Sequence, residues 1–173
     1  AREKETLLIK PGTYQADAIT IRKPINLVGD GLEGQIVLSG AGFAPLLNIE
    51  SEVTLTNLLI SVELRQENTP AILIGSNGYA KITKSRIRLT GEQPTTSLAG
   101  LSWIQLPEGY ETTQAIQVAP FGVLEVKNTH FDIFNCGNAV FLEQDSSATL
   151  INNEFHICQN AIVIIINEEA ANA

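Results

Sequence analysis

The chain has no methionine, a single tryptophan and only two cysteines among its 173 residues. Basic residues are also scarce: 11 lysines and arginines stand against 19 aspartates and glutamates, and the formal net charge is −8. A protein of this charge lacks the basic face that nucleic acids require, and it is repelled by anionic membranes and acidic polysaccharides. We therefore expect neither a nucleic-acid partner nor a membrane partner.

Long apolar runs are missing as well. No stretch reaches the roughly 18 apolar residues that a membrane-spanning helix requires. No signal peptide is visible, and no segment indicates a cellular compartment. Because methionine is absent, we expect the native start of the protein to lie before Ala1.

What the chain does contain is a repeat. An apolar phrase that opens with Ala-Ile or Ala-Val begins at Ala71, Ala115, Ala139 and Ala161. A second phrase follows the first three copies and covers residues 80–89, 124–133 and 148–157, with an earlier, looser copy at 53–62. The spacing is close to the roughly 20 to 30 residues of one solenoid turn, except where an insertion at 90–113 lengthens one repeat by about twenty.

The second phrase has the pattern of a β-strand, because apolar and polar side chains alternate along it. No stretch shows helical spacing. An antiparallel sandwich has short strands at similar intervals, but the in-register recurrence of side-chain type favours a parallel β-helix, whose turns stack about 4.8 Å apart. We predict an all-β fold, a single-stranded right-handed parallel β-helix of five to six coils, with handedness taken from the rule for parallel connections.

Stacked coils place like residues in ladders. The alignment of Leu55, Ile82, Val126 and Leu150 predicts a turn ladder of Asn57, Lys84, Asn128 and Asn152. It also predicts two interior ladders, Ile87 with Phe131 and Phe155, and Leu89 with Ile133 and Ile157, and it stacks Asn138 over Asn160. Cys136 falls over Cys158; we interpret them as reduced apolar side chains, because directly stacked Cβ atoms are wider apart than a relaxed disulfide prefers.

The amino-terminal segment carries a family resemblance. Residues 7–14, 19–21 and 25–31 are predicted to form a first coil. Their sequence resembles the opening turns of right-handed parallel β-helix proteins of the pectin lyase-like superfamily, which includes pectin methylesterases and bacterial β-helix repeat modules. The resemblance runs from Leu7 to Ile166 and rests on structural motifs, so it implies a fold rather than an activity.

The catalytic residues of that superfamily are not matched. Residues 114–118 resemble the glutamine-bearing motif of pectin methylesterases, but Asn138 and Asn160 stand where the family has its two aspartates. Asparagine neither takes up a proton at neutral pH nor attacks as a carboxylate. The arginine of that family is missing too, because no arginine follows Arg88.

Lyase and hydrolase chemistry have no visible residue set either. Pectate lyases need several acidic calcium ligands and hydrolases need paired carboxylates, whereas the aspartates here are scattered over different coils: Asp17, Asp30, Asp132 and Asp145. The fragment Arg86-Ile87-Arg88 is interpreted as surface.

Both histidines are predicted on outward positions of neighbouring coils. One outward column holds Arg86, His130 and Glu154, and the next holds Arg88, Asp132 and His156. Opposite charges stacked between coils explain these residues without catalysis. A metal held by His130, Asp132, Glu154 and His156 is the alternative.

The insertion at 90–113 is the favoured place for binding residues, because loops on rigid scaffolds commonly carry them. It contains the only tryptophan of the chain and several acidic and aromatic neighbours. The candidate ligand or partner contacts are Trp103, Glu108, Tyr110, Glu111 and Gln114. The alternative is that Trp103 and its apolar neighbours pack the loop against the flank of the solenoid.

We interpret residues 1–173 as one β-helix domain with a polar tail at 167–173, and we expect no cofactor and no metal. The leading hypothesis is a non-catalytic scaffold or binding module that contacts a polysaccharide or a protein partner. The alternatives are a carbohydrate-active enzyme (lyase, esterase or hydrolase) that uses Glu92, Glu108 and Glu111, and a purely structural segment. We also expect neighbouring domains of a longer protein, or end-to-end self-association, to cover the open ends of the solenoid.

Overall fold

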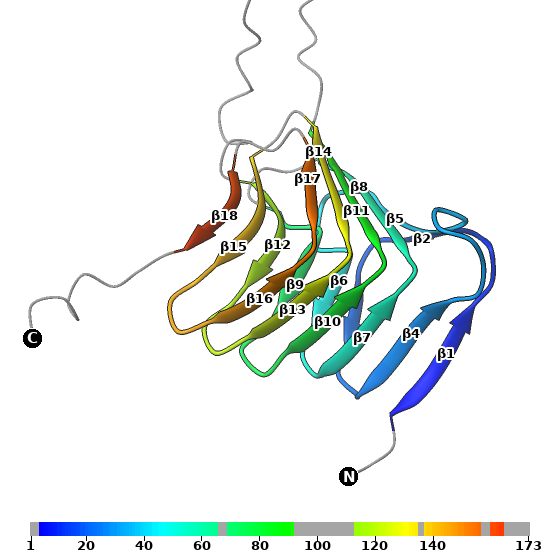
Figure 1. The fold of residues 1–173 in the computed structure, drawn as a ribbon, viewed down its shortest axis with the longest axis horizontal. Coiled ribbons are helices and arrows are strands. Elements are labelled where there is room, and N and C mark those ends of the chain that lie inside the picture. Colours follow the sequence, from blue (N-terminus) through cyan, green and yellow to red (C-terminus); the bar gives the residue numbers. More distant parts are fainter. Residues whose placement is uncertain (1–3, 66–68, 92–112, 135–136, 157–159, 165–173) are drawn as a thin grey trace, which may run out of the picture.

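The computed structural model describes residues 4–65, 69–91, 113–134, 137–156 and 160–164. Every regular element in these ranges is a β-strand, and the strands form three parallel sheets that wind into one stack (Figure 1). The predicted parallel β-helix is therefore confirmed. The described ranges contain no helix that is long and apolar enough to cross a membrane.

Each coil of the solenoid contributes one strand to each sheet. Sheet A contains β1 (Glu5–Ile9), β4 (Ile25–Gly29), β7 (Glu52–Thr56), β10 (Tyr79–Thr83), β13 (Val123–Lys127) and β16 (Ser147–Ile151). Sheet B contains β2 (Gly12–Ala16), β5 (Ile36–Gly40), β8 (Leu59–Glu63), β11 (Arg86–Thr90), β14 (His130–Phe134) and β17 (Glu154–His156). Sheet C contains β3 (Ile19–Ile21), β6 (Leu47–Ile49), β9 (Ile72–Ile74), β12 (Gln114–Val118), β15 (Asn138–Leu142) and β18 (Asn160–Ile164).

The register of sheet A confirms the alignment made from the sequence. Ile82 pairs with Leu55 on one side and with Val126 on the other, and Val126 pairs in turn with Leu150. Asn138 likewise pairs with Asn160 in sheet C. The repeat in the sequence is therefore the repeat of the coils.

Inward-facing side chains of all three sheets form one continuous apolar core. Ile87, Leu89, Phe131 and Ile133 are fully buried there, as their ladders predict. Phe155 is partly buried and its ring stacks on Phe131, with ring centroids 4.9 Å apart. Ile157, Cys136 and Cys158, the insertion at 92–112 and the polar tail lie outside the described residues.

The first coil differs from the expectation. Residues 25–31 were predicted to complete it, but β4 pairs in parallel with β1 and so opens the second coil. The first coil consists of β1, β2 and β3 alone. The sequence segment was misassigned because a solenoid returns to the same sheet only after three strands, and the early coils lack the Ala-Ile phrase that marks the later ones.

The corner between sheets A and B is a ladder of left-handed residues. Asn57, Lys84, Asn128 and Asn152 have φ values of 56°, 48°, 52° and 52°. Asparagine tolerates this conformation better than other residues with a Cβ atom. Its side chain also bonds along the ladder, since Asn152 Nδ2 donates to Asn128 Oδ1 at 2.7 Å. Lys84 is the member of the ladder that has neither the tolerance of asparagine for a left-handed backbone nor its side-chain amide.

We predict that Lys84→Asn stabilises the protein by about 0.5 to 1 kcal/mol, because it relieves left-handed strain at a position where its neighbours are asparagines. Chemical denaturation followed by circular dichroism measures the change. Lys127→Asn is the matched control, since Lys127 lies within strand β13. An equal or larger gain in the control variant would contradict the role of the corner conformation.

Candidate binding face

The outward side chains of sheet B form two columns along the solenoid axis. One column consists of Thr13, Val37, Leu59, Arg86, His130 and Glu154, and the other of Gln15, Ser39, Ser61, Arg88, Asp132 and His156. The two columns predicted around the histidines are therefore confirmed. The column members over β2, β5 and β8 are uncharged and define the uncharged half of the face, although Asp17, Glu63 and Arg65 lie beside them. The ionisable members over β11, β14 and β17 define the charged half.

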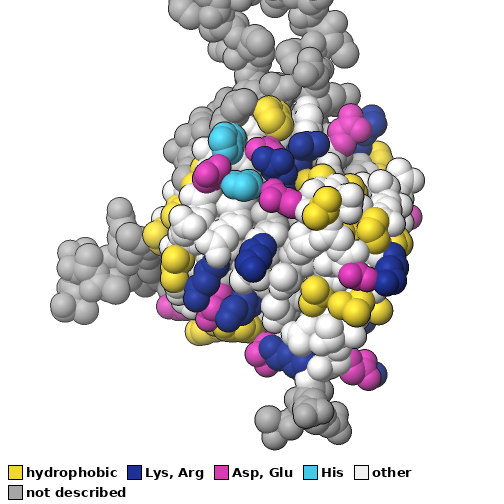
Figure 2. Space-filling model, turned by 45° about the vertical axis from the view of Figure 1, so that its right-hand side comes forward, with side chains coloured by type: hydrophobic (Ala, Val, Ile, Leu, Met, Phe, Trp, Pro, Cys, Tyr) yellow, Lys and Arg dark blue, Asp and Glu magenta, His cyan; other side chains and the backbone are white. Residues whose placement is uncertain are grey.

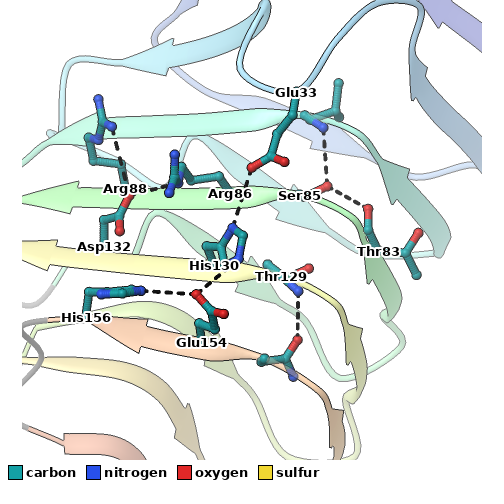
Figure 3. A network of polar contacts seen from close by, with 12 residues as sticks. Glu33, Thr83, Ser85, Arg86, Arg88, Thr129, His130, Asp132, Glu154 and His156 are labelled. Carbon is teal, nitrogen blue, oxygen red and sulfur yellow. Dashed lines mark hydrogen bonds and ion pairs between the residues drawn. The ribbon is translucent and has the colours of Figure 1, made fainter.

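Asp132 lies at the centre of the ion pairs in the charged half, and its side chain is only 11% exposed. Its Oδ2 atom lies 3.0 Å from Nε of Arg86 and 3.9 Å from Nη2 of Arg88 (Figure 3). Arg86 and Arg88 are two residues apart on β11, so both side chains leave the same face of the strand and reach the carboxylate on the next one. The carboxylate thus offsets two like charges that would otherwise repel each other.

His130 connects two acidic side chains. Its Nε2 lies 3.3 Å from Glu154 Oε2, and its Nδ1 lies 3.5 Å from Glu33 Oε1 (Figure 3). Glu154 Oε2 is also 3.4 Å from Nε2 of His156. The two histidines and their charged neighbours gather on one face of the molecule (Figure 2).

The sequence pattern did not predict Glu33 as a member of this charged cluster. It belongs to the segment between β4 and β5, which is outside the repeated phrases. The backbone N–H of Gln35 donates to the carbonyl of Leu32 at 3.1 Å and closes a turn there, with Gly34 at a φ of 81°. The charge of Glu33 and the turn signal of Gly34 were both visible, but no sequence rule says how far such a turn reaches across a neighbouring sheet.

Hydroxyl side chains fix the corner at which β11 and β14 begin. Ser85 Oγ donates to the carbonyl of Thr83 at 2.9 Å and accepts from the backbone N–H of Leu58 at 3.3 Å. In the next coil, Thr129 Oγ1 donates to the carbonyl of Lys127 at 3.1 Å. Because Arg86 and His130 follow these hydroxyl residues directly, the corner determines where the charged side chains start.

The charged half does not form the alternative metal site. Among the described residues, no group of three or more histidine, cysteine, aspartate or glutamate side chains is placed to hold a metal ion. The physical reason is that Asp132 faces the two arginines, whereas His130, Glu154 and His156 contact one another. One of the four proposed ligands, Asp132, is therefore engaged with partners that the other three do not share.

The uncharged half contains a groove of about 640 Å³. It is lined by Gln15, Ala16, Asp17, Ser39, Gly40, Ala41, Phe43, Ser61, Glu63 and Arg65. Phe43 is 65% exposed and presents an aromatic ring beside the polar side chains of this lining. The sequence reasoning missed this groove, because Phe43 lies in the non-repeated segment between β5 and β6.

Four of the five predicted contact residues lie outside the described residues: Trp103, Glu108, Tyr110 and Glu111. Gln114 is described and begins β12, where it is only 5% exposed. Its Nε2 donates to Gln117 Oε1 at 3.0 Å. Gln114 therefore packs against its neighbour in the same strand, and its role as a contact residue stays a prediction.

Sheet A presents a different polar cluster on its outer face. The phenol of Tyr79 donates a hydrogen bond to Glu125 Oε1, and Lys81 Nζ lies 3.7 Å from Glu125 Oε2. The hydrogen bond to Glu125, together with partial burial, raises the pKa of Tyr79 to about 12. The same hydrogen bond, assisted by the charges of Lys81 and Lys127, lowers the pKa of Glu125 below its ordinary value.

Comparison with known proteins adds no relative. No family model matches the chain, and neither a curated protein nor a solved structure is significantly similar to it. The architecture that the chain belongs to is the parallel β-solenoid, which its own strand register establishes.

We predict that Arg86 and Asp132 are coupled by about 1 kcal/mol in a double-mutant cycle of Arg86→Gln and Asp132→Asn, because the carboxylate is mostly shielded from water. Urea denaturation at low and high salt measures the coupling, which decreases with salt. Arg65 and Glu63 are the control pair, since their side chains are 50% and 67% exposed and 3.4 Å apart. Equal coupling in both pairs would contradict the importance of shielding.

We predict that an absorbance component titrating at about pH 12 is lost in Tyr79→Phe and kept in Tyr14→Phe. The raised pKa of Tyr79 stabilises the fold below the ordinary tyrosine value of 10.0, and this stabilisation disappears as the pH rises through about 12. The lowered pKa of Glu125 contributes stability above its ordinary value of 4.5, which is lost at lower pH. The difference in free energy of unfolding between the wild type and Tyr79→Phe should therefore be largest between pH 4.5 and pH 10.0. A difference that stays constant from acid to alkaline pH would refute the hydrogen bond between Tyr79 and Glu125 as the cause of the shifted pKa values.

Proposed function

We propose that this chain is a non-catalytic binding module of the pectin lyase-like superfamily and that it binds a glycan on the outer face of sheet B. The observation that carries the proposal is the groove beside Phe43, where an exposed aromatic ring stands next to carboxylate, amide and hydroxyl side chains. Binding sites for small polar ligands combine an apolar surface with a few convergent polar groups. The parallel β-helix and the resemblance of the amino-terminal coils support membership of the superfamily.

A neutral glycan suits this face better than an acidic one. The whole chain carries a net charge of −8, and the groove itself has two acidic side chains, Asp17 and Glu63, against one basic side chain, Arg65. A uronate-rich polysaccharide would meet like charge both at long range and in the groove. A glycan of uncharged sugars would not.

The non-catalytic part of the proposal follows from the side chains in the charged half. A glycosidase needs a carboxylic acid and a carboxylate on either side of the scissile bond, and an esterase needs an activated nucleophile. Asp132 is paired with two arginines, and Glu154 contacts both histidines. The positions that resemble the aspartates of pectin methylesterases are asparagines, Asn138 and Asn160.

Trp103, Glu108, Tyr110 and Glu111 of the insertion, and Gln114 at the start of β12, are proposed additional contacts to a glycan or to a protein partner. The insertion joins β11 to β12, so its described ends, Gly91 and Thr113, leave from the charged half of sheet B and enter sheet C.

A glycan array probed with the wild-type protein tests the proposal. We expect retention on neutral oligosaccharides, none on polygalacturonate, and no new reducing ends or unsaturated products after long incubation. Trp103→Ala in parallel reports whether the loop contributes to any signal. Silence on all glycans would refute the binding function, and release of product would show a carbohydrate-active enzyme instead.

A further inference from the structure

We propose that the groove between the segment 41–45 and strands β2, β5 and β8 is a subsite for one uncharged sugar ring, with Phe43 as the surface on which the ring stacks. The inference rests on the proposed glycan-binding function and gives it a location. It also names the residues that line the subsite; of these only Ser61 lies in a repeated phrase, and none lies in the insertion at 90–113.

The floor of the groove exists because small side chains follow one another in a column. Gln15 pairs with Ser39, and Ser39 pairs with Ser61, on three adjacent coils. The next member of the same column is Arg88, which pairs with Ser61 and begins the charged half. Since successive coils stack about 4.8 Å apart, the two serines leave a hollow about two coils wide beside a row of long side chains.

The wall of the groove is fixed by Gly42. Its φ is 74°, and a Cβ atom at this position would lie 2.1 Å from the carbonyl oxygen of Glu63 and 2.7 Å from Cα of Leu64. The carbonyl of Gly42 accepts a hydrogen bond from the backbone N–H of Arg65 at 3.2 Å. The segment is therefore pressed against β8 and the residues after it, and Phe43 is held beside Glu63 and Arg65 before any ligand arrives.

The floor also contains an unpaired polar group. Ser39 Oγ is shielded from solvent and has no hydrogen-bond partner among the described residues. A buried hydroxyl without a partner costs free energy. Rotation of the Ser39 side chain about χ1 would turn its hydroxyl into the groove, where a hydroxyl group of a bound sugar would recover this cost. Together with the amide of Gln15 and the carboxylates of Asp17 and Glu63, Ser39 supplies donors and acceptors around a ring that stacks on Phe43.

The chemistry of the lining selects an uncharged ring. Carboxylates accept hydrogen bonds from sugar hydroxyls, and they repel the carboxylate of a uronic acid. Arg65 does not remove this preference, because its ion pair with Glu63, Nη2 to Oε2 at 3.4 Å, leaves the carboxylate of Asp17 as the net charge of the lining. A sugar without a charged substituent therefore fits the groove better than an acidic one.

The test uses the full chain and titrates it with neutral oligosaccharides of glucose, galactose, mannose and N-acetylglucosamine, followed by calorimetry. Phe43→Ala should weaken the binding of whichever oligomer is retained by about tenfold or more, the loss typical of a central aromatic contact. Phe121→Ala is the matched control, because Phe121 is 68% exposed and lies outside the groove. We expect its affinity to equal that of the wild type.

The variant Ser39→Ala distinguishes a loss of affinity for the oligosaccharide from a loss of folding stability. Removing a buried unpaired hydroxyl should leave the unfolding midpoint unchanged or raise it, whereas the affinity should fall about three- to tenfold. Backbone amide shifts on titration should cluster at Gln15, Ser39, Phe43 and Glu63.

The possible failures are distinguishable. If the wild type binds a neutral oligomer and Phe43→Ala binds it equally well, the groove is not the subsite, but the binding function stands. If affinity falls as much in Phe121→Ala as in Phe43→Ala, the contact with Phe43 is likewise refuted. If the wild type binds no neutral oligomer at all, the proposed function fails.

Discussion

In-register parallel stacking of the coils is the constraint on which the rest of the structure depends. Once Leu55, Ile82, Val126 and Leu150 pair in sheet A, every other position of a coil is fixed relative to its equivalents above and below. Inward positions must then be apolar in every coil, and the corner residue between sheets A and B is left-handed in the last four of the six coils. Only outward side chains and the segments between strands are left free to vary.

The outer face of sheet B illustrates what this freedom allows. The same column that contains Ser39 and Ser61 continues through Arg88 and Asp132 without any change in backbone spacing. The change from short serine to long charged side chains in one column therefore separates the groove from the charged half. The scaffold supplies a regular spacing, and the side chains decide where a ligand could enter.

The parts of the molecule that the sequence predicted are those that repeat. The columns through Arg86 with His130 and through Arg88 with Asp132 followed from one alignment, because equivalent positions in a solenoid must touch. Glu33 and Phe43 escaped prediction for the opposite reason. Each lies in a segment that occurs once, and its position depends on local contacts, such as those of Gly42 with the backbone of β8, that no periodicity encodes.

The two halves of the face also differ in what a ligand would have to displace. In the charged half, Asp132 contacts Arg86 and Arg88, and Glu154 contacts both histidines. A ligand bound there would exchange these ion pairs for new contacts with little net gain in free energy. In the groove, the Phe43 ring is in water. Ser39 Oγ lacks a hydrogen-bond partner among the described residues, as do Arg86 Nε and His130 Nδ1 in the charged half, but Ser39 has no ion pair to exchange. A sugar ring there covers apolar surface and satisfies a polar group at once. The uncharged half of the face is therefore the better place for a ligand than the charged half.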